Sequence, residues 1–481
     1  MLTRLRVRGF KNLANVDLRF GPFTCIAGAN GVGKSNLFDA ISFLSALASK
    51  SLMDAALSVR DEGARFGDIR SLFHHVGGRY AAEMSFDVEM IIPHEGIDDL
   101  GQRAEATTTF VEYGVTIRRR EDDGGRSLEL VREVLTHIKL REAPARLCFP
   151  NDAVWRKSTV SGRRGTPYFS TDSGIIRLHQ DGGSHGRWNA LLAASLPRTA
   201  LSVTNAAESP TATLARREMQ SWRLLQLEPS ALRRPDDFAA PARLGQDGAH
   251  LAATLYRLAQ RQNGNGASSA AGRAYGEIAN TLAELIDDVR DVRVEKDDKR
   301  ELLTLLVRGR DGTSHPARAL SDGTLRFLAL AVLQLDPENQ GLLCLEEPEN
   351  GIHPDRIPAM IRLLEDLSVD TSVPVGPENP LRQVIINTHS PGVVMEVPDD
   401  SLLLAELIET EQDGLYPRVL SFACMSETWR DEHKFLRPVS KGRLLAYLNP
   451  VIMHPVRESS YRRVVDRQDI HQYSLFGAGK K

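Results

Sequence analysis

The chain opens with alternating apolar and polar positions, followed by a compact apolar run and then a helical pattern. Leu2–Arg8 and Val16–Phe20 alternate with period two, which predicts two strands that each bury one face. Phe23–Ala27 is mostly apolar, as is typical of a strand buried on both faces. After it, apolar residues recur at helical spacing, at Leu37, Phe38, Ile41, Leu44 and Leu47. We therefore expect two half-buried strands, a central strand and an amphipathic helix, in that order.

Similar patterns continue along the rest of the chain. Alternation at Ala82–Met90 and Val111–Ile117 predicts an antiparallel sheet. Two more buried strands are predicted at 342–347 and 383–389, and an apolar helix at 325–335. Together these elements indicate an α/β fold with a mixed sheet core and an added antiparallel sheet.

A helical segment separates the two halves of this core. The spacing turns helical at Ala212–Leu227, Ala249–Gln262 and Tyr275–Val289, and Asn263–Gly272 is a low-complexity link. The absence of sustained heptads disfavours a long coiled-coil arm. We expect the N-terminal half of the core, with the antiparallel sheet, at 1–200 and a helical insert at 201–290. The C-terminal half of the core is expected at 291–420, and an extension with a tail at 421–481.

Composition narrows the class of protein. The 481 residues carry 60 Lys and Arg against 63 Asp and Glu, whereas a protein that coats DNA without specificity is usually more basic. The cysteines are far apart and lack the spacing of a metal site; they are Cys25, Cys148, Cys344 and Cys424. The N-terminus has the pattern of a strand and not of a signal peptide, and no apolar run approaches the roughly 20 residues that cross a bilayer. We expect a cytoplasmic protein without a membrane partner.

The loop between the first buried strand and the helix carries the clearest chemistry. It matches GxxxxGK[ST] in full and reads Gly28-Ala29-Asn30-Gly31-Val32-Gly33-Lys34-Ser35. In such a loop the glycines allow backbone N–H groups to surround phosphates, and the helix N-terminus favours negative charge. Lys34 would reach the β and γ oxygens, and the Ser35 hydroxyl would bind Mg²⁺. The strand before the loop and the helix after it predict binding of ATP with Mg²⁺.

The residues around this loop resemble the opening of RecF and SMC-type ATPases. The resemblance rests on Gly9–Leu13, on Asn30–Asn36 and on Asp39–Ile41. It implies an ABC-type ATPase head of the RecF/SMC/OLD group, with Asn36 as part of the nucleotide-binding loop.

A second motif resembles the ABC signature. Ala319–Thr324 precedes the predicted apolar helix and departs from the usual LSGGQ at Asp322 and Thr324. Ser321 and Gly323 at a helix N-terminus can form an anion site, although Ser-Asp-Gly also fits a plain N-cap and turn. In the family the signature binds the γ-phosphate held by the other subunit. The resemblance therefore implies a homodimer with ATP between its two heads.

The two predicted strands of the C-terminal half end in polar residues. The first ends in Glu346 and Glu347 and resembles the Walker B strand, and the second ends in His389, which resembles the switch histidine. By that resemblance Glu346 helps to hold Mg²⁺, Glu347 polarises the attacking water, and His389 contacts the γ-phosphate. A carboxylate at the carboxyl end of a central strand suits in-line attack by water. The Q-loop glutamine of such ATPases has no clear motif here, and we expect it near Asp68–Phe73.

The residues after the second strand bear on function. OLD-type proteins carry a nuclease there that needs a Glu and a DxD, whereas Asp399 and Asp400 are adjacent, so we expect no intrinsic nuclease. The leading interpretation is an ATP-dependent dimeric switch that acts with nucleic acid and a separate nuclease or effector. It resembles the standalone Septu and PARIS ATPase subunits of bacterial anti-phage systems. A RecF-like repair or replication ATPase is the alternative, and a transporter's nucleotide-binding subunit is disfavoured by the SMC-like N-terminus and the large insert.

Two further segments suggest partners. Between 118 and 198, basic residues are interleaved with Trp155 and Tyr168, a pattern that fits either nucleic-acid contact or solvated strand faces. The tail residues Gln472, Leu475 and Phe476 resemble the peptide by which bacterial proteins dock on the replication sliding clamp. Packing of these tail residues on the head or on a dimer partner is the alternative.

Overall fold

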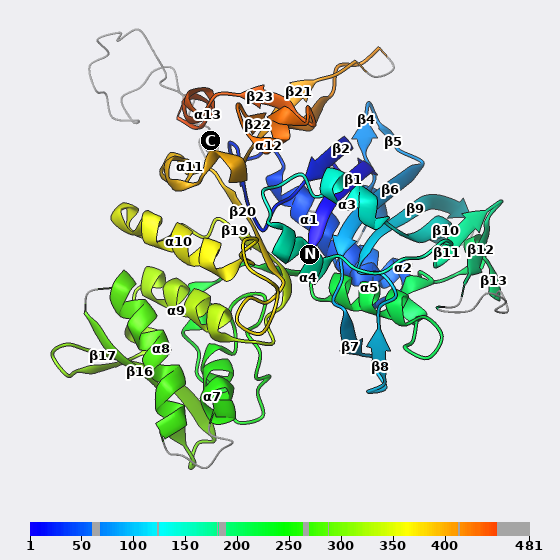
Figure 1. The fold of residues 1–481 in the computed structure, drawn as a ribbon. Coiled ribbons are helices and arrows are strands. Elements are labelled where there is room, and N and C mark those ends of the chain that lie inside the picture. The colour runs from blue at the N-terminus through cyan, green and yellow to red at the C-terminus, as the bar shows by residue number, and fades with distance from the viewer. Residues whose placement is uncertain are drawn as a thin grey trace, which may run out of the picture. The chain divides into compact units, whose positions relative to one another are not determined.

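The computed structural model describes residues 1–59, 68–122, 125–179, 181, 189–262, 269–286, 288–411 and 414–449, and within them two large sheets organise the chain (Figure 1). Met1–Leu448 form one compact unit. The tail residues Gln472, Leu475 and Phe476 lie outside the described residues. No helix in the described part of the chain combines the length and the apolar character needed to cross a bilayer.

The first sheet is antiparallel and includes the N-terminal strands. Its order is β13-β12-β11-β10-β9-β6-β1-β2. The alternation predicted for the first strand is confirmed, because Leu5 and Val7 are buried whereas Arg8 is exposed. The strands are β1 (Leu2–Phe10), β2 (Leu13–Arg19), β6 (Glu83–Ile91), β9 (Phe110–Asp122), β10 (Gly125–His137), β11 (Phe169–Asp172), β12 (Ile175–Leu178) and β13 (Asn189–Leu192).

The second sheet is mixed and carries the strands that precede the sequence motifs. In the order β14-β19-β20-β3-β21-β22-β23, the strands from β14 to β21 are parallel, β22 is antiparallel to β21, and β23 is parallel to β22. Because parallel neighbours end at the same edge, the carboxyl ends of β14, β19, β20 and β3 lie side by side. The strands are β3 (Phe23–Ala27), β14 (Arg223–Leu225), β19 (Gly341–Glu346), β20 (Arg382–Thr388), β21 (Leu402–Glu409), β22 (Arg418–Met425) and β23 (Arg437–Val439).

Both faces of this mixed sheet are covered, which is why its central strands β3 and β20 are buried along their whole length. Helix α1 (Lys34–Leu47) shares one core with the antiparallel sheet and with Ile26 and Ile385 of the mixed sheet. On the other face, Leu343 and Ile386 pack with helices α9 (Asp322–Leu335) and α10 (Ile357–Leu367). Successive strand residues point to opposite faces, so alternate residues of one strand belong to different cores. Figure 1 shows α1 and α10 on opposite sides of β19 and β20.

The insert is not purely helical. Helix α5 (Pro210–Gln220) ends early, and the prediction of a helix through Leu227 is wrong, because residues of this segment form β14 and pair with β19. Helix α7 (Leu251–Gln262) lies close to its predicted position. Helix α8 (Ser269–Leu285) begins within the predicted low-complexity link and ends before Val289, which begins a strand. They pack with a small sheet of β15 (Asp236–Asp237), β16 (Val289–Asp297), β17 (Leu302–Gly309) and β18 (Ser314–Pro316).

Candidate active site

The glycine-rich loop joins β3 to α1 in the conformation that its motif requires. Gly31 and Gly33 have φ values of 79° and 95°, in the left-handed region that favours glycine. Lys34 is buried, and its Nζ donates to the carbonyl oxygens of Gly28 at 2.7 Å and Ala29 at 3.0 Å. Burial lowers the pKa of Lys34, whereas three nearby carboxylates act in the opposite direction. The loop therefore holds a lysine ammonium at its centre, at the N-terminus of α1.

Asn12 fastens this loop to the turn between β1 and β2. Its Nδ2 donates to the Val32 carbonyl at 3.0 Å, and its Oδ1 accepts from Asn36 Nδ2 at 2.8 Å. A Cβ on Gly33 would lie 2.0 Å from Asn12 Nδ2, so this glycine is required by close approach as well as by its backbone angle. The Gly9–Leu13 segment, which carries the RecF/SMC resemblance, thus contributes directly to the shape of the loop.

The predicted base and histidine lie together at the ends of β19 and β20. Glu347 follows β19 with a left-handed backbone (φ 43°), and its N–H lies 3.0 Å from the side-chain oxygen of Asn387. His389 Nδ1 lies 2.7 Å from Glu347 Oε1, and Asn350 Nδ2 donates to Glu347 Oε2 at 2.9 Å. Both carboxylate oxygens of Glu347 therefore have partners that fix the orientation of the side chain.

Gln226, which the motifs did not identify, lies beside the Walker B acid. It follows β14 directly, and its Nε2 donates to Glu346 Oε2 at 2.6 Å. The expectation of a Q-loop near Asp68–Phe73 is wrong: in this structure that segment lies beside β1, where Phe73 pairs with Phe10. The only local signal for Gln226 is that a glutamine follows a strand of three residues. Parallel pairing of that strand with β19 brings Gln226 next to Glu346.

Arg326 is a second residue that the motifs did not identify. It lies on α9, and its Nη1 lies 3.4 Å from the carbonyl oxygen of Glu347, at the limit of a hydrogen bond. Its Nε is buried and has no partner among the described residues. Burial lowers the pKa of Arg326, against the opposing effect of nearby carboxylates such as Glu228. The site therefore holds two cationic side chains, Lys34 and Arg326.

These residues enclose a polar cavity of about 410 Å³. Gly28 does not line this cavity, but its carbonyl oxygen accepts a hydrogen bond from Lys34 Nζ. The lining combines loop backbone, two cations, carboxylates and amides: Asn12, Asn30, Gly31, Gly33, Lys34, Ser35, Asn36, Gln226, Leu227, Glu228, Arg326, Glu346, Glu347, Asn350 and Asn387. Left-handed glycines and a central lysine suit a chain of phosphates, and oxygen ligands from Ser35 and Glu346 suit Mg²⁺. The residues present therefore fit ATP with Mg²⁺.

The signature residues face a different cavity. Ser321 Oγ accepts from the Thr324 N–H at 3.2 Å, so this serine caps α9 as the plain N-cap interpretation expects. A Cβ on Gly323 would lie 3.0 Å from the carbonyl oxygen of Gly351, so the start of α9 packs closely on the loop after β19. The cavity of about 680 Å³ is lined by Glu284, Ile286, Ser321, Gly323, Thr324, Phe327, Gly351, Ile352, His353, Asp355, Arg356 and Ala359.

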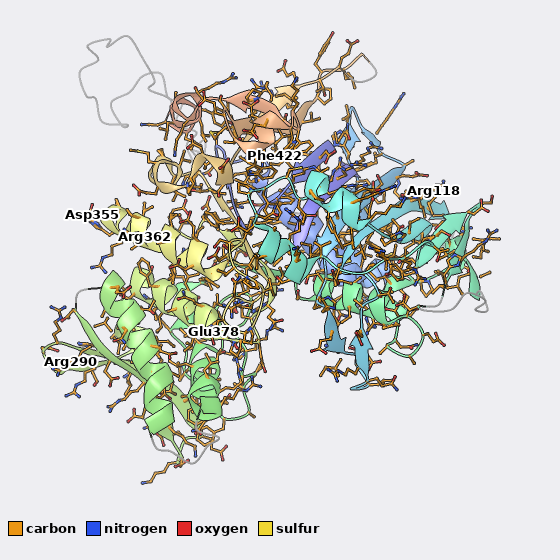
Figure 2. All side chains as sticks on the ribbon, viewed as in Figure 1. Arg118, Arg290, Asp355, Arg362, Glu378 and Phe422 are labelled. Carbon is orange, nitrogen blue, oxygen red and sulfur yellow. The ribbon has the colours of Figure 1, made fainter. Side chains whose placement is uncertain are left out.

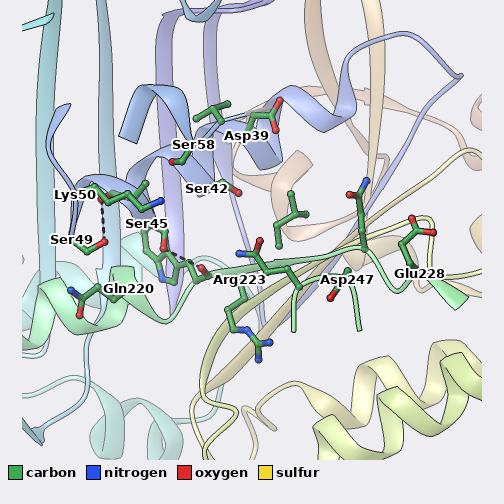
Figure 3. A pocket seen from close by; sticks show the side chains of 16 residues that line it. Asp39, Ser42, Ser45, Ser49, Lys50, Ser58, Gln220, Arg223, Glu228 and Asp247 are labelled. Carbon is green, nitrogen blue, oxygen red and sulfur yellow. Dashed lines mark hydrogen bonds between the residues drawn. The ribbon is translucent and has the colours of Figure 1, made fainter. Parts of the chain in front are cut away.

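Another polar cavity, of about 520 Å³, adjoins the nucleotide cavity. It shares Gln226 and Glu228 with the nucleotide cavity, and Ser42, Ser45 and Arg223 are among its lining residues (Figure 3). Ser45 Oγ already donates to the Trp222 carbonyl at 3.1 Å. This cavity therefore borders the segment that carries Gln226.

Within the described residues of the basic and aromatic segment at 118–198, Trp155 and Tyr168 offer no stacking surface. Trp155 and Tyr168 are buried, with 0% and 1% exposure, so neither ring is available to a base. Arg118 is exposed on the antiparallel sheet (Figure 2) and pairs with Glu83 at 2.7 Å. These two rings therefore do not support base stacking, whereas the exposed Arg118 fits a solvated strand face.

Two protein-family models match this chain, and each matched region contains part of the candidate site. Residues 1–96 match the RecF/RecN/SMC N terminal domain. Residues 181–396 match the family described as "AAA domain, putative AbiEii toxin, Type IV TA system".

Curated relatives match over short stretches. Three of them are called DNA replication and repair protein RecF, and they come from Phocaeicola vulgatus, Paenarthrobacter aurescens and Magnetococcus marinus. The identities are 37% over 67 residues, 41% over 73 and 52% over 44. These stretches are 14%, 15% and 9% of this chain, and they span only 18%, 17% and 12% of the relatives' lengths.

Solved structures of SMC heads are similar over most of the chain. The Smc head bound to the C-winged helix domain of ScpA matches 87% of this chain and 97% of its own, at 15% identity and a TM-score of 0.43. The SMC head domain from Thermotoga maritima matches 88% of this chain and 99% of its own, at 13% identity and a TM-score of 0.35.

The glycine-rich loop lies within the first matched region, and Gln226, the signature, the two acids and His389 lie within the second. The family matches and the cavity agree, because the regions similar to the RecF/RecN/SMC N terminal domain and to the AAA domain together carry the residues that line it.

Proposed function

We propose that the nucleotide cavity hydrolyses ATP to ADP and phosphate with Glu347 as the general base. The observation that carries this proposal is the 2.7 Å contact between Glu347 and His389, at adjacent strand ends beside the phosphate-binding loop. As the water oxygen bonds to the γ-phosphorus, its proton passes to the Glu347 carboxylate, and the bond from the γ-phosphorus to the ADP oxygen breaks. Lys34 and Arg326 balance the charge on the phosphate oxygens.

Other residues prepare this step. His389 and Asn350 each hold one oxygen of the Glu347 carboxylate, which limits its rotation before the water attacks. The Ser35 hydroxyl and the Glu346 carboxylate would hold Mg²⁺, which supplies further positive charge next to the phosphates. Gln226 would keep Glu346 directed toward the ion, because it already donates to Oε2 of that residue.

We further propose that two copies of the chain close over ATP. Ser321 and Gly323 line their own cavity, apart from the one that holds Lys34. A signature that does not face its own nucleotide is available to a second copy, and isologous pairing would build two composite sites. The homodimer with ATP between its heads follows from this arrangement.

Mixing two inactive variants tests the composite site. Ser321→Arg should block hydrolysis while leaving ATP binding to the same chain intact, and Lys34→Ala should block binding. A mixture of the two should regain activity, because one site of each mixed dimer has an intact loop and an intact signature. Ser195→Arg, at an exposed serine of the short 3-10 helix that follows β13, is the matched control and should keep full activity. A mixture without any recovery, from chains shown to exchange, contradicts the model.

For the biological role, we propose a switch in bacterial defence that acts on a separate nuclease or effector in response to nucleic acid. The toxin–antitoxin family matched by residues 181–396 supports this proposal. The RecF relatives and the match over residues 1–96 support the alternative, an ATPase of DNA repair or replication. Strains that carry wild-type protein or Glu347→Gln can be compared for phage plating and for survival of DNA damage. Protection from phage that needs Glu347 supports defence, and damage survival alone supports repair.

A further inference from the structure

Glu349 is a buried acid in the loop that follows β19. Its side chain is 7% exposed, and the Thr388 hydroxyl at the end of β20 donates to its Oε1. Its Oε2 is buried and has no hydrogen-bond partner among the residues that the structure describes. Glu349 is not among the residues that line the nucleotide cavity.

Stability does not explain an acid at this position. A buried carboxyl with one unpaired oxygen is costly, and an apolar side chain of similar size would fill the space at lower free energy. Burial raises the pKa of Glu349, against the opposing effect of the Thr388 hydrogen bond. An acid that disfavours folding at a position next to the catalytic pair points to a role in the reaction.

Thr388 links Glu349 to the histidine of the site. Its Oγ1 also accepts from the Ser390 N–H at 2.9 Å, so the Thr388 hydroxyl bonds both to Glu349 and to the residue that follows His389. The turn that presents His389 to Glu347 is therefore fixed at its base by the Glu349 carboxyl.

The same loop reaches the signature cavity. The next residue, Asn350, donates to Glu347 Oε2, and Gly351 packs against Gly323 at the start of α9. His353, two residues further on, lines the signature cavity. Residues 347–353 therefore connect the base to the surface expected to serve a second nucleotide, and Glu349 is the buried anchor between them.

We propose that Glu349 is a positioning residue of this ATPase. Its carboxyl fastens loop 347–353 to the Thr388–Ser390 turn, so that the Glu347–His389 pair and the signature-facing residues keep one geometry. This inference rests on the proposed function, because it assigns Glu349 to the same hydrolysis step. A residue that acts only through positioning should change kcat and leave ATP binding in place.

Glu349→Ala and Thr388→Val each remove one side of the anchor. Each should lower kcat by about 10- to 100-fold, the loss expected when a reacting group moves by about 1 Å, with the Kd for ATP unchanged. Because both remove the same contact, the double variant should be no slower than the slower single variant. Glu349→Gln and Thr388→Ser keep an acceptor and a donor, respectively, and should restore most of the rate.

Glu133→Gln is the matched control, since Glu133 is a fully buried acid of β10 in the other sheet that accepts from the Ala200 and Leu201 N–H groups. It should lower Tm without changing kcat. The inference is overturned if Glu349→Ala and Thr388→Val behave like this control, or if their effects on kcat add. Should Glu349→Ala fail to fold, Thr388→Val and the two conservative variants still decide the question. Glu347→Gln measured in parallel separates the proposals: wild-type turnover in that variant contradicts the base, whatever Glu349 does.

Discussion

Replacement of Glu347 by glutamine tests the chemistry of the site with little change to its shape. The glutamine can direct its oxygen to Asn350 Nδ2 and its amide nitrogen to an unprotonated Nδ1 of His389. Both observed contacts are then kept, so the free energy of unfolding should change by less than about 1 kcal/mol. The proton acceptor is lost, and hydrolysis should slow by about 10²- to 10⁴-fold. At about 1.36 kcal/mol per decade, this loss raises the barrier by about 3 to 5 kcal/mol.

Single-turnover phosphate release gives the rate of hydrolysis, and calorimetric titration with ATP gives the affinity. Affinity should be retained, because Lys34 and the loop N–H groups do not depend on Glu347 for their positions. If two heads close over ATP, light scattering should show the variant accumulating as an ATP-bound dimer. Glu338→Gln replaces a half-exposed acid outside the cavity lining and is the control. Turnover of Glu347→Gln within about threefold of wild type would refute the assignment of the base.

Three other substitutions or deletions follow from the structure. Gly33→Ala should abolish ATP binding in a titration, because the added Cβ would lie 2.0 Å from the Asn12 side-chain amide. Gly31→Ala is the control and should retain more affinity, since its Cβ would meet no atom within 4 Å. Equal losses of affinity in the two variants would contradict the role of the Asn12 contact. Gln226→Ala should raise the Mg²⁺ concentration needed for half-maximal hydrolysis, since it frees the Walker B acid, and an unchanged Mg²⁺ dependence would argue against this role. Deletion of 470–481 separates the two interpretations of the tail. If the tail packs on the head or on a dimer partner, the truncated protein should lose stability or dimerisation. If it docks on the sliding clamp, clamp binding should vanish while ATPase activity and Tm stay constant.

The sequence predicted those parts of the site whose chemistry is local. The glycine-rich loop, the strand before it and the helix after it were recognisable because phosphate binding dictates glycine positions within a few residues. The strands that precede Glu347 and His389 were recognisable from their apolar runs, Leu342–Leu345 and Val384–Ile386, since a parallel strand covered on both faces is mostly apolar. The N-cap role of Ser321 was also readable, because capping involves only neighbouring residues.

Only the tertiary structure decided which residues from distant segments of the chain meet in the site. Gln226 meets Glu346 across 120 residues because a strand too short to show periodicity pairs with β19, and the same pairing overrode the helical spacing before Leu227. Arg326 reaches the cavity only because α9 packs on one face of the mixed sheet, and Trp155 is buried although its basic neighbours suggested a surface. Motifs report what a short stretch of backbone must do, whereas partners far apart in sequence are set by strand order and packing.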